Sequence, residues 1–249
     1  MRVIIVKDYD AMSKKAGEFL AGEMKKKPNF VLGLATGSTP IGLYKELIRL
    51  NKTGEIDFSK TITFNLDEYI GLAPTHNQSY HYFMFDNLLN HININSKNVH
   101  VPDGLAKDVE KFCEEYEKMI DKSGGLDVQV LGIGGNGHIG FNEPGSSLGS
   151  KTRIKTLTQK TIDDNARFFD KKEDVPCSAI TMGVGTIMNA KKCLILANGK
   201  NKAEAVFQTI EGCITAQVPA SALQLHQYVI AIIDEAAASE LKGENYERI

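Results

Sequence analysis

The sequence predicts an α/β protein with a single-domain, three-layer Rossmann-like fold, in which two layers of helices cover a central, mostly parallel sheet. Two observations support this fold class. Short apolar runs rich in branched residues alternate with longer segments of helical periodicity along the 249 residues, which is typical of strand–helix–strand units. The runs also lack an apolar–polar alternation, as expected for strands buried on both faces. No repeat or linker interrupts the pattern, so we expect one domain over residues 1–249.

The expected elements follow from these runs. Strands are expected at residues 3–6, 30–35, 61–66, 98–101, 179–182, 192–197 and 228–234, with another beginning at residue 126. Helices are expected between residues 8 and 28, at 41–50, 80–89, 107–122, 184–190 and 201–211, and briefly after residue 234. Asp8 or Asp10 can cap the first helix. Residues 146–175 have the least regular pattern and are interpreted as a lid segment over a cleft.

The overall composition indicates which kinds of molecule the protein binds. The formal net charge at pH 7 is −2, so there is no global basic field of the kind that binds nucleic acid. No apolar run approaches membrane-spanning length, and the N-terminal run is too short for a signal peptide. The scattered cysteines form no CxxC pair and fit a reducing compartment. We therefore expect a cytoplasmic protein that acts on a small molecule, with no nucleic-acid or membrane partner.

Three polar motifs each follow directly after a predicted strand. They are TGSTP (36–40), DEY (67–69) and GGNGHIGFNEP (134–144). In an open parallel sheet, the carboxyl ends of the strands share one edge, and ligands bind beyond it. We therefore expect the three motifs to meet in one pocket, although they lie far apart in the sequence.

The TGSTP motif has the features of an anion site. Gly37 frees the backbone, Ser38 and Thr39 offer hydroxyl and N–H groups, and Pro40 suits the first position of the following helix. A helix N-terminus with free amides binds anions, most naturally phosphate. An ordinary capped turn would have the same sequence, and the Gly-Lys-Ser/Thr element of a P-loop is missing.

The DEY motif places two carboxylates at the end of a strand. Such a group can act as a general base if its surroundings tune its pKa. Alternation along the strand directs Asp67 and Glu68 to opposite sides, so at most one faces the pocket. The other would cap the next turn or be solvated.

The glycine-rich loop holds His138 five residues before Glu143. A carboxylate bonded to one imidazole nitrogen fixes the tautomer and frees the other nitrogen for proton transfer. The spacing Gly132-x-Gly134-x-x-Gly137 formally matches a dinucleotide-binding fingerprint, but the acidic residue expected about 20 positions later is missing. A metal site at His138 is the competing interpretation, and it lacks a second histidine or a cysteine cluster nearby.

Several longer segments carry a family resemblance over nearly the whole chain. They are FVLGLATGSTPIGLYKEL (30–47), TFNLDEYIGL (63–72), GIGGNGHIGFNEPGSSLGSKTRIKTLT (132–158), RFFD (167–170), MGVGTIM (182–188) and ASALQLH (220–226). Together they resemble the glucosamine-6-phosphate deaminases of the glucosamine/galactosamine-6-phosphate isomerase family. The DEY and GHIGFNEP segments are the most specific parts.

The resemblance implies a reaction and catalytic roles. D-glucosamine 6-phosphate and water would become D-fructose 6-phosphate and ammonia, with no metal or organic cofactor. His138, oriented by Glu143 and Asn136, would open the pyranose ring. Asp67, favoured over its neighbour on this ground, would then move the C2 proton to C1 through an enolamine.

The resemblance also implies a phosphate site and raises two departures from the family pattern. The phosphate would lie on residues 37–39, with Arg167 and Lys202 as cationic partners. Many family members carry Asp at the position of Asn136, so the pH profile is expected to differ. The resemblance matches three residues to activator-binding positions of hexameric members: Ser146, Arg153 and Lys155. The longer tail of those members is missing here, so the expected state is either a monomer or a homo-oligomer.

Two other functions share parts of this sequence pattern. A hydrolase of the 6-phosphogluconolactonase type would use the histidine to activate water, but it needs no base at position 67. A non-enzymatic sugar-phosphate sensor of similar fold would need neither that base nor the His138–Glu143 pair. The two motifs therefore favour the deaminase.

Overall fold

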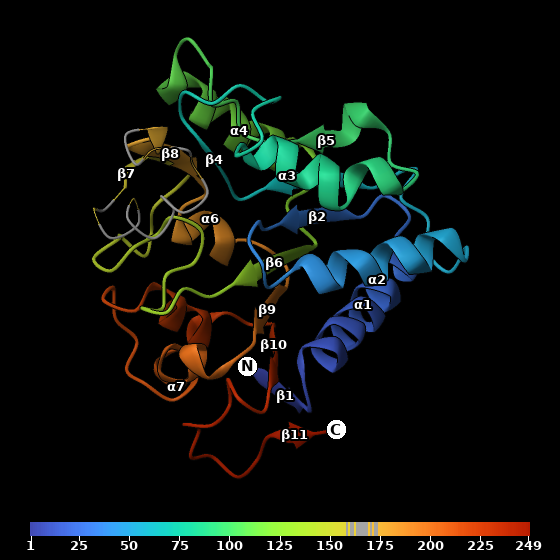
Figure 1. Cartoon of the computed structure of the whole chain (residues 1–249), viewed down its shortest axis with the longest axis vertical. Coiled ribbons are helices and arrows are strands. Elements are labelled where there is room, and N and C mark those ends of the chain that lie inside the picture. Colours follow the sequence, from blue (N-terminus) through green and yellow to red (C-terminus); the bar gives the residue numbers. More distant parts are fainter. Residues whose placement is uncertain (158, 160–161, 163–168, 170, 172–173) are drawn as a thin grey trace.

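The computed structural model of the protein describes residues 1–157, 159, 162, 169, 171 and 174–249 (Figure 1). Within these residues, an eight-stranded sheet has the order β11-β1-β10-β9-β6-β2-β3-β5, and its paired neighbours are parallel. Its strands are β1 (Arg2–Val6), β2 (Val31–Leu34), β3 (Ile62–Asn65), β5 (Val99–His100), β6 (Val128–Gly132), β9 (Cys193–Ala197), β10 (Val229–Asp234) and β11 (Glu247–Arg248). The predicted parallel α/β fold is confirmed.

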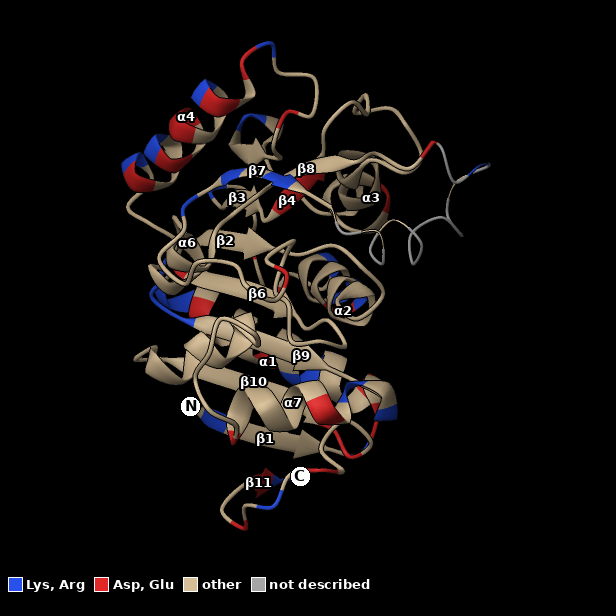
Figure 2. Cartoon of the chain, turned by 90° about the vertical axis from the view of Figure 1, so that its left-hand side faces the viewer, with Lys and Arg blue, Asp and Glu red and all other residues tan. Residues whose placement is uncertain are grey.

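Helices cover both faces of this sheet and make the three layers (Figure 1). One apolar core joins the sheet to α1 (Tyr9–Lys26), α2 (Ile41–Lys52) and α3 (Tyr80–Asn87). The other core joins it to α4 (Val109–Lys122), α6 (Val184–Met188) and α7 (Ala203–Ile210). Figure 2 shows acidic and basic residues spread along α4, whose buried residues are Cys113, Tyr116 and Ile120. This spacing is the one expected of an amphipathic surface helix.

The start of α1 illustrates how local sequence sets an element boundary. Asp8 has an extended backbone, and its carboxylate accepts a 2.9 Å hydrogen bond from the Ala11 N–H. Asp8 rather than Asp10 is therefore the N-cap. From there, buried residues recur at Met12, Ala16 and Leu20 and face the sheet.

A second, antiparallel sheet lies beside the carboxyl ends of the central strands, and it was not predicted. Its order is β4 (Asp67–Tyr69), β8 (Ser178–Thr181), β7 (Arg153–Thr156). The expectation that residues 179–182 belong to the parallel sheet is therefore wrong. The expectation that residues 146–175 are irregular is wrong for β7, and part of that lid segment lies outside the described residues.

Leu66 transfers the chain from one sheet to the other. Its N–H donates to the Leu34 carbonyl of the central sheet at 3.0 Å, while its own carbonyl accepts from the Met182 N–H beside β8 at 2.7 Å. The predicted third strand therefore ends at Asn65, and Asp67 begins a strand of the second sheet. This transfer places Asp67 at the edge where the ligand is expected.

The C-terminal end also differs from the prediction. Residues 235–240 form turns instead of a short helix, because the Asp234 carboxylate accepts the Ala237 N–H at 2.7 Å and holds a tight turn. The chain then returns as β11 along β1. No helix in the part of the chain that the structure describes has the length and apolarity to cross a membrane.

Candidate active site

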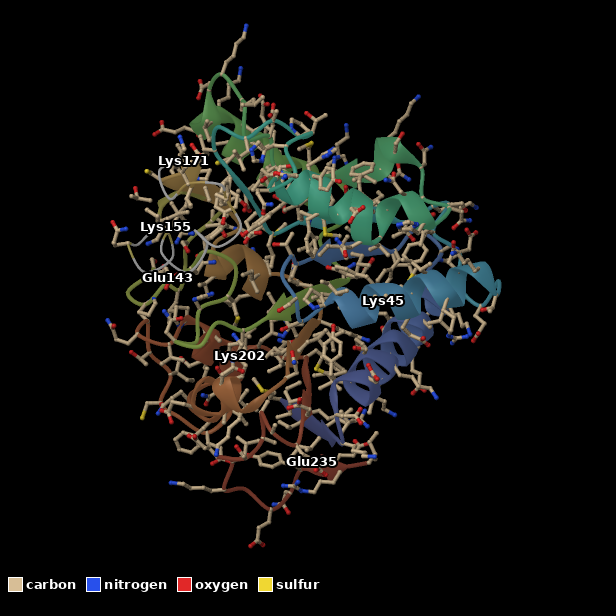
Figure 3. The ribbon with its side chains drawn as sticks, viewed as in Figure 1. Lys45, Glu143, Lys155, Lys171, Lys202 and Glu235 are labelled. Atoms are coloured by element: carbon tan, nitrogen blue, oxygen red, sulfur yellow. The ribbon has the colours of Figure 1, made fainter. Side chains whose placement is uncertain are left out.

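A cavity of about 410 Å³ opens at the carboxyl ends of β2, β3 and β6. The three predicted motifs meet in it. Its lining includes Gly37, Ser38 and Thr39 after β2, Asp67 after β3, His138 after β6, and Lys202 from the short 3-10 helix Lys200–Lys202. Figure 3 marks Lys202 together with Glu143 of the glycine-rich loop. The predicted spatial relation between the motifs is therefore confirmed.

The TGSTP loop forms one wall of the cavity. Gly37 has a φ of 103°, in the left-handed region that favours glycine. Pro40 occupies the N-cap of α2, one residue before its predicted place, and makes no side-chain cap. The hydroxyl of Thr39 donates to the Asn198 side-chain oxygen at 3.2 Å and ties the loop to the segment that carries Lys202. A helix start of this kind presents backbone N–H groups, which suits an anion.

Lys202 adds a positive charge to this wall. Burial lowers the pKa of its ammonium group, and none of the described residues forms an ion pair with it. The backbone before it is fixed, because the Asp234 carboxylate accepts the Gly199 N–H at 2.9 and 3.0 Å. A phosphate would supply the missing counter-charge. Arg167, the other predicted cation, lies outside the described residues.

Asp67 is buried and lines the same cavity. Burial raises the pKa of its carboxyl to about 8, and the charge of Glu68 adds to the rise. Its Oδ1 atom makes no hydrogen bond within the described part of the chain. Gly140, at a φ of 57°, lies so close that a Cβ atom there would be 3.3 Å from Asp67 Oδ2. A carboxyl held in this way is a strong base with few fixed partners.

Glu68 points away from the cavity, as alternation predicts. Its carboxylate accepts the N–H groups of Tyr69, Tyr80 and His81 at 2.8, 2.9 and 2.8 Å. Two of these donors belong to the first turn of α3, where a negative charge is stabilised by the helix dipole. Burial still raises the pKa of Glu68, although the three N–H groups oppose the rise. The pair therefore divides into a cavity group and a helix-capping group.

His138 is held by a chain of side chains rather than by Glu143 alone. The Asn136 side-chain oxygen lies 2.7 Å from His138 Nδ1, and the Asn136 amide donates to Glu143 Oε2 at 2.9 Å. The other Glu143 oxygen lies 3.5 Å from His138 Nδ1. A carboxylate can only accept, so the Asn136 amide nitrogen must face Glu143 and its oxygen must face the ring. The neutral imidazole therefore carries its proton on Nδ1 and keeps a lone pair on Nε2.

Gly134 of this loop is required by the close approach of the ring. A Cβ atom at Gly134 would lie 2.2–2.4 Å from three imidazole atoms of His138. Gly137 adopts a φ of 79° and closes the turn with a 2.9 Å bond to the Gly134 carbonyl. The loop is thus shaped around the imidazole, and a dinucleotide-binding helix does not follow it.

Two aromatic residues of the cavity were not predicted as site residues. Tyr80, at the start of α3, and Phe141 line the cavity and stack with centroids 5.9 Å apart and an interplanar angle of 4°. The sequence marks residues 80–89 only as an aromatic-rich helix. Nothing in a single sequence distinguishes an aromatic residue at a site from one in the core.

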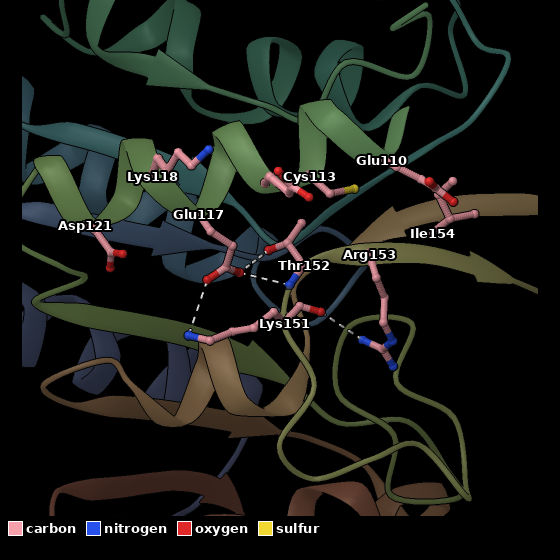
Figure 4. A pocket seen from close by; sticks show the side chains of 10 residues that line it. Glu110, Cys113, Glu117, Lys118, Asp121, Lys151, Thr152, Arg153 and Ile154 are labelled. Atoms are coloured by element: carbon pink, nitrogen blue, oxygen red, sulfur yellow. Dashed lines mark hydrogen bonds and ion pairs between the residues drawn. The ribbon is translucent and has the colours of Figure 1, made fainter. Parts of the chain in front are cut away.

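A larger hollow of about 530 Å³ lies elsewhere, between α4 and β7 (Figure 4). It contains Arg153 but none of the predicted catalytic residues. At its floor, Glu117 accepts hydrogen bonds from Thr152 and lies 3.4 Å from Lys151 Nζ. Burial opposes ionisation of Glu117, but its donors outweigh burial and lower its pKa. The contacts join α4 to β7 and indicate a structural role.

The described residues hold no cluster of three or more His, Cys, Asp or Glu side chains arranged for a metal ion. The cavity is lined by residues 37–39, which we call the anion loop, and by Lys202. The buried carboxyl of Asp67 and the imidazole of His138 line it as well. Together these groups can move protons on a phosphorylated substrate.

The comparisons with known proteins agree with this geometry. The model of the family described as glucosamine-6-phosphate isomerases/6-phosphogluconolactonase matches residues 7–231. A curated glucosamine-6-phosphate deaminase from Thermoanaerobacter sp. (strain X514) is 60% identical over 249 residues, which is 100% of this chain and 98% of the relative. Another from Clostridioides difficile (strain 630) is 53% identical and is covered completely, as is this chain.

Solved structures lead to the same family. A structure described as a monomeric glucosamine-6-phosphate deaminase is 46% identical, with a TM-score of 0.94 over 97% of this chain and 100% of that one. A 6-phosphogluconolactonase from Thermotoga maritima, 20% identical with a TM-score of 0.74 over 94% of this chain and 100% of that one, shares the fold alone. The chain belongs to the family of glucosamine-6-phosphate isomerases and 6-phosphogluconolactonases.

Proposed function

We propose that the protein converts D-glucosamine 6-phosphate and water into D-fructose 6-phosphate and ammonia. The observation that carries the proposal is the shared cavity, which is lined by Asp67, His138 and the anion loop. The reaction needs proton transfers at two places on a phosphorylated sugar, and the cavity offers two separate proton-transfer groups and an anion site. The deaminase relatives that are 53% and 60% identical over the full chain support the same activity.

The phosphate of the substrate would bind at the start of α2. Backbone N–H groups of residues 37–39 would donate to its oxygens, and the helix dipole would favour its negative charge. Lys202 would pair with it, and its burial without an ion pair among the described residues supports that role. Arg167 remains proposed as a second cation from the resemblance alone.

His138 would open the pyranose ring. In the tautomer fixed by Asn136, the lone pair of Nε2 would accept the proton of the O1 hydroxyl and pass it to the ring oxygen O5. Asn136 and Glu143 would orient the ring and stabilise the positive charge that it carries between these two transfers. Their hydrogen bonds at 2.7 and 2.9 Å support this assignment.

Asp67 would then act at the carbon atoms. Its carboxylate would remove the C2 proton of the open-chain aldehyde while O1 takes up a proton, which gives an enolamine. It would then return a proton to C1 as the amine loses one. The product of this step is an imine at C2, and addition of water followed by loss of ammonia gives the ketose. The raised pKa of Asp67 supports the assignment, because a carboxylate with a pKa near 8 is a stronger base than an exposed one.

A coupled assay for ammonia release tests the proposal. Purified protein with D-glucosamine 6-phosphate should form ammonia and D-fructose 6-phosphate in equal amounts. Hydrolysis of 6-phosphogluconolactone without ammonia release would instead identify a lactonase. Binding of the sugar phosphate without turnover would identify a sensor, and either result would overturn the proposal.

We also propose that the enzyme is a cytoplasmic monomer. The relative that is 46% identical is described as monomeric, and the four cysteines are free thiols, which fits a reducing compartment. Sedimentation with and without N-acetylglucosamine 6-phosphate tests the oligomeric state. A stable hexamer, or assembly on addition of this sugar phosphate, would contradict the monomer.

A further inference from the structure

Helix α2 begins without a cap from its own sequence. Pro40 occupies the N-cap and has no side-chain oxygen that could accept a hydrogen bond. The cap comes instead from another helix, because the hydroxyl of Tyr9 in the first turn of α1 accepts the Gly42 N–H at 2.7 Å. This satisfies one of the free amides at the start of α2.

The same hydroxyl also holds the loop itself. Tyr9 donates its proton to the Ser38 carbonyl at 3.1 Å. A phenol has one proton to donate and lone pairs to accept with, so the two bonds are compatible. One side chain thus bridges the carbonyl of the loop and the amide of the helix that follows.

The bond to Ser38 fixes the direction of the next N–H group. The peptide unit between Ser38 and Thr39 is planar and trans, so its carbonyl and its N–H point in opposite directions. Ser38 and Thr39 both line the cavity, whereas Tyr9 lies outside its lining. A carbonyl turned toward Tyr9 therefore faces away from the cavity, and the Thr39 N–H points the other way. A flipped peptide would present the negative end of the carbonyl to the anion.

The residue before Ser38 leaves the start of the loop flexible. Gly37 has a φ of 103° and no Cβ atom, so the two peptide units that flank it rotate easily, and the bond from Tyr9 anchors the loop directly after them. The Ser13 hydroxyl donates a 2.8 Å bond to the Tyr9 carbonyl, but this bond lies within the backbone of α1 and does not involve the phenol group. A Cβ atom at Gly42 would lie 2.9 Å from a ring carbon of Tyr9 and 2.1 Å from Ser13 Oγ, so α1 and α2 are in close contact here.

We propose that Tyr9 is a positioning residue for the phosphate site, holding the Ser38–Thr39 peptide in the orientation that presents an N–H group to the anion. The identity of the substrate rests on the proposed function, whereas the binding of an anion at this loop is argued from geometry alone. Tyr9 does not touch the reacting atoms, so its effect falls on binding and leaves the chemical step alone.

The test compares Tyr9→Phe with a matched variant at the same helix contact. Tyr9→Phe removes both hydrogen bonds and keeps the ring, whereas Ser13→Ala removes the bond within α1 and leaves the loop anchored. Three quantities are measured for each protein: the Kd for inorganic phosphate, KM for D-glucosamine 6-phosphate, and kcat. For Tyr9→Phe we expect Kd and KM to rise about threefold to tenfold, which corresponds to the loss of about one hydrogen bond between the loop and the anion. We expect its kcat, and all three values for Ser13→Ala, to stay within about twofold of the parent protein.

The shift in Tm caused by a fixed phosphate concentration gives a second measurement, which is taken relative to the ligand-free Tm of each variant. It remains valid if Tyr9→Phe is less stable, and the shift should shrink in Tyr9→Phe but not in Ser13→Ala. An unchanged phosphate Kd in folded Tyr9→Phe, or a loss confined to kcat, would overturn the proposal. Equal losses in both variants would assign Tyr9 a purely structural role and overturn it too. Phosphate affinity does not depend on turnover, so a failure of the deaminase assignment is distinguishable.

Discussion

Asp67 shows how one buried carboxyl group can become a base. The chain removes it from water, gives its Oδ1 atom no hydrogen bond within the described residues, and places Glu68 beside it. Burial disfavours the charged form, so the group ionises only near pH 8. The base is thereby strengthened, and its basicity is set by position rather than by residue type.

The first prediction concerns this carboxyl. Asp67→Asn keeps the shape but removes the base, so kcat should fall by about 10²–10⁴-fold. Exchange of the C2 proton of D-glucosamine 6-phosphate with solvent, followed by NMR in deuterium oxide, should disappear. Binding of the sugar phosphate, measured by titration, should stay largely intact. Exchange at the rate of the parent protein would refute the assignment of Asp67 as the base.

At position 136 the chain has Asn, where the family resemblance leads us to expect Asp. The Asn136 amide joins His138 to Glu143 and adds no charge. Asn136→Asp would place a second carboxylate about 3 Å from Glu143 and against the ring. The added negative charge favours the protonated imidazole over the neutral one, so the pH profile of kcat/KM should differ from that of the parent protein. Superimposable profiles for the variant and the parent protein would show that the amide is not part of the relay.

The turns of the glycine-rich loop together hold the His138 imidazole in its position. Gly134→Ala would put a Cβ atom 2.2–2.4 Å from the His138 ring, which must then move. A displacement of about 1 Å in a catalytic group can cost 10²-fold in rate, so kcat should fall by about that factor. The Kd for phosphate should not change, because the anion loop is a separate element.

Gly22 on α1 provides the matched control for this substitution. A Cβ atom there meets nothing within 4 Å, so Gly22→Ala should leave kcat unchanged. Because it removes a glycine from a helix interior, it should raise the free energy of unfolding by about 0.5–1 kcal/mol. Full activity of Gly134→Ala would show that the loop tolerates a shifted ring.

The buried carboxyl of Asp67 lowers the free energy of unfolding of the whole protein, and the size of this cost depends on pH. In the unfolded chain an aspartate has a pKa of about 3.9, whereas the folded value for Asp67 is about 8. Between these values the folded state keeps a proton that the unfolded state has lost, so stability falls as pH rises through this window. A tenfold change in a proton-binding constant corresponds to about 1.4 kcal/mol, so the cost above pH 8 is at most roughly 6 kcal/mol.

Asp67→Asn should remove this cost. We expect its Tm to exceed that of the parent protein at pH 8.5 and the difference to shrink as the pH falls toward 4, where the unfolded carboxyl also begins to hold its proton. Comparison at each pH cancels the contributions of Glu23, Glu117 and Asp127, whose lowered pKa values stabilise the fold above the acid range. A Tm difference that does not vary with pH would contradict the raised pKa of Asp67.

The sequence by itself determined the parallel α/β fold, the meeting of three motifs at one sheet edge and the placement of Asp67 and Glu68 on opposite sides of their strand. These features follow from local patterns, because strand periodicity fixes the direction of side chains and parallel strands end on one edge. The pairing of His138 with Glu143 was predicted from their spacing, whereas the roles of Asn136 and Asp67 were implied by the family resemblance.

Only the tertiary structure decided the features that depend on contacts between distant segments. The second sheet forms because β4 and β7 both pair with the distant strand β8, and no local pattern encodes that pairing. The cavity position of Tyr80 and the bridge from Tyr9 to the anion loop depend on how helices pack, and in sequence both residues look like ordinary helix aromatics. Periodicity is a property of neighbours in the chain, whereas a site is made by neighbours in space.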